Sequence, residues 1–460
     1  MMGRFYRKTF PEARADERKI RFDGFALGTE NKAGIFSFSD VRNCLFRDGK
    51  METGFGFSPY YTAEGEIPSV NDPEDPPAAF ALLPYTDAGE RKTALMYVSE
   101  TGVSYIWNEE YGTFDFTLKT FDDVPAILPV YDKNGKAALA FCGKDGVWLY
   151  DREREFSQVY AESAANAACV FHERLFFIEK PFTVRYCAPL DSNDWEENAD
   201  DAGYIEFPSE EGELMGLKVL NETVYLFRER GIIKLDAKGA ARDFSAELLP
   251  YGGERIFSGS IAVCGERIFF LAESGVYAFE ERKISRVDVP VFPARKGQVC
   301  ECAAWDGKYF LRYADENGEF KVLILDSETR EACFSVPSIR ALSNTESLLI
   351  CLSENNICLA DKDGDLPSGN LYAACKENTD FGISGRKLWK TLTLDGEGTC
   401  RIEIGNEYEK RSFDGKFKDG KLSVRPLLKG ERFSLRLYPQ KATRFSGAEI
   451  VLDVFESAGG

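Results

Sequence analysis

The chain has 460 residues, of which 44% are hydrophobic and 29% are charged, and its formal net charge is −19. A field of that sign repels phosphate backbones, which disfavours broad nucleic-acid binding and leaves open local binding by a basic patch. Phe occurs 36 times and Tyr 20 times, and aromatic residues favour half-buried pleated surfaces, so the composition favours strands. The longest apolar runs are too short for a transmembrane helix, which needs about 18 residues or more.

The N-terminal part of the chain carries the clearest charge asymmetry. Its first 22 residues hold seven Lys or Arg against three Asp or Glu. Two interpretations stay open: a solvated tail, or an arm that docks on an acidic neighbour such as another copy of the chain. The opening MMGRFYRKTF lacks the apolar core of a secretion signal, so we expect no signal peptide. We expect residues 1–60 to form this arm and an irregular segment, and the acidic, Pro-rich residues 61–78 to form a linker or surface loop.

A repeat occupies the middle of the chain. Each copy has a short apolar strand, a tight polar turn and a second apolar strand, as in AALAFCGKDGVWLYD at 137–151. The turns recur at a mean spacing of about 42 residues, which is typical of WD40-type propeller blades. Gly and Asn suit such turns because they tolerate a positive φ at least cost. The turn positions are Gly102, Gly146, Thr183, Gly231, Gly275, Gly318 and Asn356.

Further strand-like runs flank each hairpin, so each repeat supplies about four short strands, or one blade. The sequence therefore predicts an all-β, WD40-like β-propeller of about seven four-stranded blades over residues 79–375. Six or eight blades remain open. After it, longer alternating runs such as RFSLRLYP and AEIVLDVFE predict a small antiparallel, sandwich-like β domain over 376–460.

The residues that usually carry catalysis or bind metals are scarce. His172 is the one histidine of the chain, so neither a His-based triad nor a two-His metal site can form, and we interpret it as a polar residue at a strand edge. Several of the twelve cysteines lie in apolar runs, which indicates small buried residues in a reducing compartment, and Cys300 and Cys302 form a C-x-C without a second pair nearby. No phosphate-binding loop, nucleophile elbow or sialidase-type Asp-box occurs. We therefore expect no catalytic, cofactor-binding or metal-binding residues, and no enzyme.

Two acidic segments leave alternatives open. Asp361, Asp363 and Asp365 alternate as cation ligands do, but the glycine falls too early for an EF-hand and no Glu follows at the twelfth position, so a solvated turn is the other interpretation. The insertion at 188–203 contains Trp195, which either pins this loop to the blade or belongs to a contact surface.

The same insertion carries a resemblance to a known family. Residues 174–236 resemble a segment of β-propeller proteins from tailed bacteriophages and prophages, in which an RLFFS-like strand is followed by a conserved-looking run ending in ERG. The opening DVRNCLFRDGKMETGFGF (40–57) is also similar, although Gly54 stands where those proteins have Arg, and SGRKLWKTLTL and GERFSLRLYP match their final β domain. The matching positions within 174–236 are Asp191, Trp195, Gly203, Tyr204, Ile205, Gly216, Leu217, Tyr225, Phe227, Glu229, Arg230 and Gly231.

The resemblance implies a virion structural or assembly protein of the neck or tail, assembled in the bacterial cytoplasm. Its expected partners are other virion or tail proteins or copies of itself. Two alternatives stay open: a propeller that binds a glycan or another ligand, and, less favoured, a propeller hydrolase with paired carboxylates.

Overall fold

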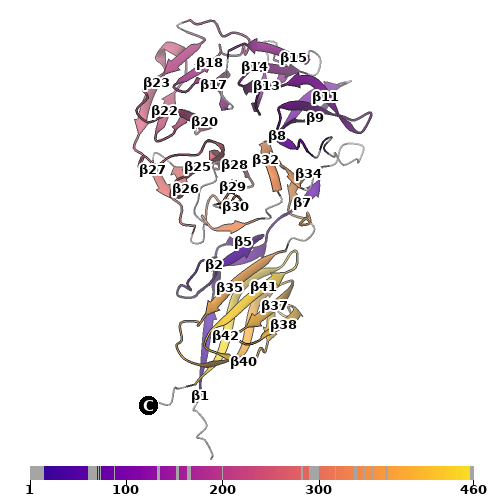
Figure 1. Ribbon diagram of the computed structural model, residues 1–460, viewed down its shortest axis with the longest axis vertical. Helices are drawn as coiled ribbons and strands as arrows, with labels where there is room; N and C mark the ends of the chain where they lie inside the picture. Colours follow the sequence, from indigo (N-terminus) through magenta and orange to yellow (C-terminus); the bar gives the residue numbers. More distant parts are fainter. Residues whose placement is uncertain are drawn as a thin grey trace, which may run out of the picture. The chain divides into compact units, whose positions relative to one another are not determined.

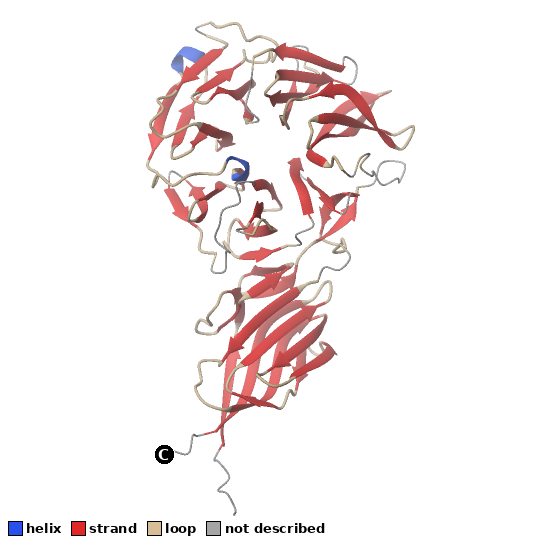
Figure 2. Ribbon diagram, in the orientation of Figure 1, coloured by secondary structure: helices blue, strands red, loops and turns tan. Residues whose placement is uncertain are grey.

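The computed structural model describes residues 15–455 apart from 61–69, 71, 73, 88, 132–134, 152–154, 163–166, 199, 281–282, 290–299, 316, 336–338, 346–347, 354–355 and 368–370. The described part is almost entirely β, and its helices are two short 3-10 turns, η1 (Ala241–Asp243) and η2 (Ser258–Ser260) (Figure 2). This confirms the all-β fold class expected from the composition.

The chain divides into two compact units. The propeller unit comprises Phe55–Arg330 and Phe334–Asn370, and the sandwich unit comprises Met1–Gly54, Glu331–Cys333 and Leu371–Gly460. The short strand β31 (Ala332–Phe334) spans one of the boundaries between them in the sequence. The sandwich unit is therefore assembled from both ends of the sequence, and the propeller unit is inserted between its parts.

Six antiparallel four-stranded sheets make up most of the propeller unit, in a ring around a common axis (Figure 1). Their strands are β8 (Pro77–Asp87), β9 (Glu90–Ser99), β10 (Val103–Asn108) and β11 (Thr113–Thr120); β12 (Ala126–Tyr131), β13 (Ala137–Gly143), β14 (Gly146–Asp151) and β15 (Glu155–Tyr160); β16 (Ala168–Phe171), β17 (Arg174–Lys180), β18 (Thr183–Tyr186) and β19 (Gly203–Glu206); β20 (Leu214–Leu220), β21 (Thr223–Arg228), β22 (Ile232–Asp236) and β23 (Ser245–Leu249); β24 (Ala262–Cys264), β25 (Arg267–Ala272), β26 (Gly275–Glu280) and β27 (Lys283–Arg286); and β32 (Ile339–Thr345), β33 (Leu348–Ser353), β34 (Asn356–Asp361) and β7 (Gly56–Pro59).

The propeller class is confirmed, but the expected count of about seven four-stranded blades is slightly too high. Between the fifth and the last of these sheets, β28 (Cys300–Trp305), β29 (Lys308–Ala314) and β30 (Phe320–Asp326) form an antiparallel ladder rather than a separate four-stranded sheet. The sequence period counted hairpins, and the hairpin at this position does not belong to a separate four-stranded sheet. The first strand of each set contacts the first strand of the next, and β32 returns to β8.

The ring is closed by a strand from the beginning of the propeller unit. β7 pairs antiparallel with β34, with Gly56 opposite Asp361 and Pro59 opposite Cys358. The last blade therefore takes its outer strand from about 300 residues earlier in the chain, which removes two exposed sheet edges at once. Residues 55–59 belong to the propeller, whereas the sequence placed the whole of 1–60 outside it; most of the expected linker at 61–78 lies outside the described residues.

Apolar side chains fill the spaces between consecutive blades. Phe121, which follows the first blade, stacks on Phe141 of β13 at a centroid distance of 5.3 Å, and Phe227 of β21 meets Phe270 of β25 edge-on at 5.5 Å. All four rings are buried. Each sheet thus covers both faces against its neighbours, which accounts for the high aromatic content of the sequence.

The hairpin glycines mostly have the conformation that the repeat predicted. Gly102 has φ of 87° and Gly146 of 105°, and a Cβ at either would lie 2.2 Å from a backbone carbonyl oxygen. Gly275 and Gly318 also have positive φ. Gly231 does not have a positive φ. A larger residue is disfavoured at this position because the side chain of Glu211 lies 3.0 Å from where a Cβ would be.

The sandwich unit contains two antiparallel sheets and one parallel strand pair. Trp389 of one sheet meets Phe433 of the other edge-on at 5.4 Å, so side chains of the two sheets share one core. One sheet has β1 (Ala15–Phe22), β5 (Cys44–Arg47), β6 (Lys50–Thr53), β36 (Lys387–Glu397), β39 (Lys421–Val424), β40 (Leu428–Gly430) and β42 (Arg444–Phe455); the other has β4 (Asp40–Arg42), β35 (Ala373–Thr379), β37 (Thr399–Gly405), β38 (Lys410–Lys416) and β41 (Phe433–Pro439); the parallel pair is β2 (Gly24–Leu27) and β3 (Ile35–Phe38).

The N-terminal segment is more ordered than an irregular arm. β1 pairs with β42 along its whole length, from Ala15 opposite Phe455 to Phe22 opposite Ala448. Phe22, Phe25 and Phe36 are buried. The expected β domain at 376–460 therefore incorporates residues from the beginning of the chain, because β42 offers an edge that β1 covers. The basic arm proper, residues 1–14, lies outside the described residues.

Candidate functional site

The residues singled out for metal binding do not come together in the part of the chain that the structure describes. There, no group of three or more His, Cys, Asp or Glu side chains is arranged to hold a metal ion. Cys300 and Cys302 lie on β28 as free thiols. Burial raises the pKa of Cys300 to about 12 and that of Cys302 to about 11, so both stay protonated at neutral pH.

His172 occupies a tight turn between β16 and β17. Its φ is 43°, it is exposed, and its ring stands edge-on to Phe171 at 4.3 Å. His tolerates the left-handed region better than most residues, so this is a turn position at a strand edge, as the sequence indicated.

The acidic run at 361–365 holds the closing strand. One carboxylate oxygen of Asp361 accepts a hydrogen bond from the amide of Asp363 at 2.9 Å, and the other accepts one from the hydroxyl of Ser58. The carbonyl of Asp365 accepts the amide of Phe57 at 2.9 Å. The hydrogen bonds of this acidic run therefore connect β7 to the end of β34.

The insertion after β18 is pinned by Trp195. The indole is only 9% exposed and packs against Tyr160 at 5.4 Å and Phe177 at 5.2 Å, while its Nε1–H donates to the carbonyl of Ser192. Of the two interpretations of Trp195, pinning of the loop is confirmed.

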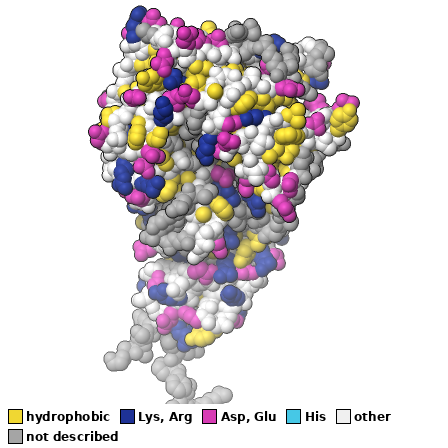
Figure 3. Space-filling view, turned by 45° about the horizontal axis from the view of Figure 1, so that its top comes forward, with side chains coloured by type: hydrophobic (Ala, Val, Ile, Leu, Met, Phe, Trp, Pro, Cys, Tyr) yellow, Lys and Arg dark blue, Asp and Glu magenta, His cyan; other side chains and the backbone are white. Residues whose placement is uncertain are grey.

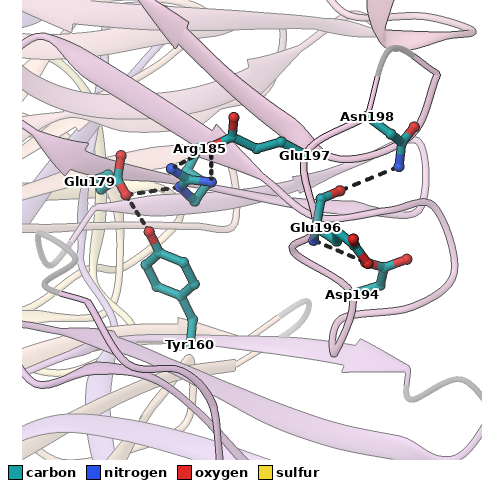
Figure 4. A network of polar contacts seen from close by, with 7 residues as sticks. All are labelled: Tyr160, Glu179, Arg185, Asp194, Glu196, Glu197 and Asn198. Carbon is teal, nitrogen blue, oxygen red and sulfur yellow. Dashed lines mark hydrogen bonds and ion pairs between the residues drawn. The ribbon is translucent and has the colours of Figure 1, made fainter.

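A polar network joins this insertion to two blades (Figure 4). Arg185 donates from Nε to Glu179 at 2.9 Å and forms an ion pair with Glu197 at 3.3 Å. The hydroxyl of Tyr160 donates to the same Glu179 oxygen, and the guanidinium lies over the rings of Tyr160 and Tyr204 at 5.3 and 5.4 Å. Sequence reasoning missed this network, because nothing in the spacing of these residues indicates that they meet.

Glu179 is the buried member of the network, with a side chain 2% exposed. Burial pushes its pKa upward, but hydrogen bonds from Tyr160 and Arg185 and the charge of Arg185 outweigh burial and hold the pKa below its usual value. A carboxylate that stays ionised at neutral pH is a poor general acid. In this network Glu179 is therefore an ionised acceptor that holds Tyr160 and Arg185 together.

Two further buried arginines hold loops through backbone carbonyls. Arg228, which is 1% exposed, pairs with Glu211 at 2.9 Å and donates to the turn that leads into β20. Arg174 does the same for the insertion and for the loop after β22. The accepting carbonyls are those of Pro208 and Gly212 for Arg228, and of Asp200, Asp201 and Gly239 for Arg174.

A pocket of about 730 Å³ opens among loops of three neighbouring blade positions in the propeller unit. The turns β24–β25 and β28–β29 and the end of β34 surround it. It is lined by Val263, Cys264, Gly265, Ala304, Trp305, Asp306, Gly307, Ala360, Asp361 and Lys362. Its volume is within the range of small-molecule sites.

The outer strand of the first blade carries a bulge with an exposed leucine. Three residues of β11, Thr117 to Lys119, lie opposite the single residue Ser104 of β10. Leu118 at the centre of the bulge has φ of 60° and is 80% exposed, and Phe116 is 46% exposed. A leucine in the left-handed region costs roughly 1–2 kcal/mol, so the strand holds this side chain outward against a local preference.

Both ends of the bulge are anchored. The buried Ser104 donates from its hydroxyl to the carbonyl of Lys119 at 2.8 Å and accepts at its own carbonyl from Thr117 at 3.0 Å. The ammonium of Lys119 pairs with Asp145 of the second blade and lies 3.9 Å from the ring centroid of Trp148. The bulge is thus fixed from two blades.

The surface of the molecule mixes charges of both signs with apolar patches on the face that Figure 3 presents. No helix among the described residues is long and apolar enough to cross a membrane.

Comparisons with known proteins identify no family. No protein-family model matches the sequence, and no curated protein matches it. Among solved structures, virginiamycin B lyase from Staphylococcus aureus aligns at 9% identity and a TM-score of 0.45, over 64% of this chain and 97% of its own. BBS1N in complex with ARL6DN aligns at 11% identity and a TM-score of 0.46, over 68% of this chain and 99% of its own. BamB from Moraxella catarrhalis aligns at 11% identity and a TM-score of 0.40, over 84% of this chain and 100% of its own. These TM-scores lie below 0.5, so the propeller assignment rests on the sheet order itself.

Proposed function

We propose that this chain is a non-enzymatic scaffold that binds partner proteins through the outer edge of its first blade. The observation that carries the proposal is the anchored bulge, which holds Leu118 outward at an energetic cost. Exposed apolar side chains that a rigid frame holds in place are typical of protein contacts.

The charges beside this edge indicate what kind of partner fits. Asp115 is exposed and precedes Phe116 in the strand, and the lysine of the same strand, Lys119, is already paired with Asp145. An acidic side chain beside apolar anchors complements a basic, apolar surface, which would also be drawn toward a chain of net charge −19. We therefore assign the edge to a partner protein that presents such a surface.

In its finer form, the proposal is that the partner and this chain belong to the neck or tail of a tailed phage or prophage virion. Its support is the sequence resemblance over residues 174–236. Genes for portal, capsid or tail proteins beside this gene would agree with it, and a transporter or sugar-utilisation locus would contradict it.

The direct test is the protein content of particles from the strain that carries the gene. Mass spectrometry of purified particles should find the chain in fixed proportion to the other virion subunits. Leu118→Glu should reduce incorporation by about tenfold or more, because a buried charge removes an apolar anchor.

The matched control is Leu248→Glu, on the outer strand of another blade, where the leucine is 53% exposed. It should leave incorporation unchanged. Particles that lack the chain would refute the virion role, and equal incorporation of both variants would refute the assignment of the first-blade edge.

A further inference from the structure

The pocket among the β24–β25 turn, the β28–β29 turn and the end of β34 has a balanced set of charges. Asp306 and Asp361 line it together with Lys362, and the ammonium groups of Lys362 and Lys308 each lie 3.5 Å from the same oxygen of Asp306. Lys308 lies just outside the lining, and with its ammonium group counted, the two carboxylates and two ammonium groups sum to zero. The site thus has no net attraction for an anion or a cation and offers both hydrogen-bond acceptors and donors.

The lining also has an apolar platform. Trp305 stands at the end of β28, opposite Lys308 across the turn, and meets Phe55 edge-on at 5.2 Å. The contact with Phe55 fixes the orientation of the indole of Trp305, and Trp305 is one of the residues that line the pocket. An aromatic wall beside a few polar groups is the usual composition of a small-molecule site.

Two glycines leave the backbone of the pocket open. Gly265 has φ of 61° and Gly307 of 69°, and in both cases the one heavy atom near the position of a Cβ is Oγ of Ser327, at 3.6 and 3.8 Å. The turn residue Asp306 also has a positive φ, of 49°, so the Asp-Gly pair forms a tight two-residue turn. Its carboxylate is therefore presented on a rigid hairpin rather than on a long loop.

We propose that this pocket binds a neutral, hydroxyl-rich ligand, a sugar residue of a glycan. Hydroxyl groups donate to the carboxylates of Asp306 and Asp361 and accept from Lys362, and the apolar C–H face of a pyranose ring packs on Trp305. A phosphate or a sialic acid gains no net attraction in this pocket, because the ammonium groups of Lys362 and Lys308 are already paired with Asp306. This inference is independent of the first-blade edge and of the virion role.

The test uses the full chain on an array of neutral hexose and N-acetylhexosamine oligosaccharides and their sialylated counterparts, with calorimetry on the strongest neutral binder. Binding of neutral glycans is expected, and Asp306→Asn and Trp305→Ala should each weaken it by about tenfold. Trp305→Phe should retain part of the affinity, which separates loss of the platform from loss of the fold.

Asp363→Asn is the matched control, since Asp363 lies two residues from Asp361 outside the lining. It should bind as the unaltered chain does. Absence of binding to every neutral glycan, preference for sialylated ones, or equal affinity of Asp306→Asn and the control would each overturn the proposal. Incorporation of Asp306→Asn into particles is expected to be normal, so failure here is distinguishable from failure of the scaffold role.

Discussion

At the scale of single residues, the propeller places several side chains against their own preferences. Leu118 is in the left-handed region, which glycine adopts without steric cost. We expect Leu118→Gly to stabilise the propeller by about 1 kcal/mol, since relief of the strain exceeds the entropy that glycine loses. Leu248→Gly, at an exposed strand position without a positive φ, should destabilise it by about 0.5–1 kcal/mol.

The measurement is the denaturant midpoint of both variants, followed by a signal from the propeller tryptophans. A destabilised Leu118→Gly would show that the leucine packs on something that holds it in place, contrary to its 80% exposure.

The second residue-scale prediction concerns Glu179. Its pKa in the folded chain is lower than in the unfolded chain, so its contribution to stability is complete above the unfolded pKa of about 4.3 and is lost as pH falls through the folded pKa. We expect Glu179→Gln to lower stability by about 2 kcal/mol at pH 7, where a charge-assisted hydrogen bond is lost. The difference in stability between Glu179→Gln and the unaltered chain should become smaller below about pH 4.3, where the Glu179 carboxylate becomes protonated.

Denaturant midpoints at pH 7 and at decreasing pH test this. Glu197→Gln, with a side chain 56% exposed, should change stability by less than about 0.5 kcal/mol at either pH. If the difference in the free energy of unfolding between Glu179→Gln and the unaltered chain stayed constant with pH, the lowered pKa of Glu179 would be contradicted.

At the scale of elements, closure of the ring depends on two glycines. A Cβ on Gly56 would lie 2.2 Å from the carbonyl oxygen of Gly364, and both sides of this contact are backbone. We expect Gly56→Ala to separate β7 from the end of β34 and to destabilise the propeller by about 3 kcal/mol. Gly252→Ala is the control: no heavy atom lies within 4 Å and φ is not positive, so the change should be neutral or slightly stabilising. Thermal denaturation measures the difference in midpoint between Gly56→Ala and Gly252→Ala. Equal midpoints would be incompatible with the close approach of Gly56 to the backbone of Gly364.

Elements built from neighbouring residues were predictable, and elements joined across the sequence were not. The hairpin around Gly146 pairs Gly143 with Gly146, so apolar alternation and turn chemistry suffice to find it. β7 and β1 lie about 300 and 430 residues from their partners, and no local pattern indicates those partners. The phenylalanines near the beginning of the chain were the available signal that it is folded, and the structure shows Phe22 and Phe36 buried.

The candidate site was less accessible from the sequence than the fold. Trp195 stood out because a large aromatic in an acidic loop needs a place to pack. Leu118 did not, because a strand with alternating apolar residues gives no sign of a bulge until Ser104 is found opposite three residues. The pocket around Trp305 combines turns from separate blades, which only closure of the ring brings together.

At the scale of the whole molecule, the propeller is inserted in the sequence between the parts of the sandwich unit and is closed by its own first strand. Closure makes the ring a rigid frame, and a rigid frame is what lets short loops and a strained bulge present fixed surfaces.

The amide protection of β7 tests that closure most directly. The amide of Phe57 donates to Asp365 and that of Tyr60 donates to Ile357, each at 2.9 Å. Hydrogen exchange followed by mass spectrometry should therefore find residues 56–60 as protected as β33, which lies inside the same sheet. Exchange of residues 56–60 at the rate of a free chain, while β33 stays protected, would contradict a closed ring.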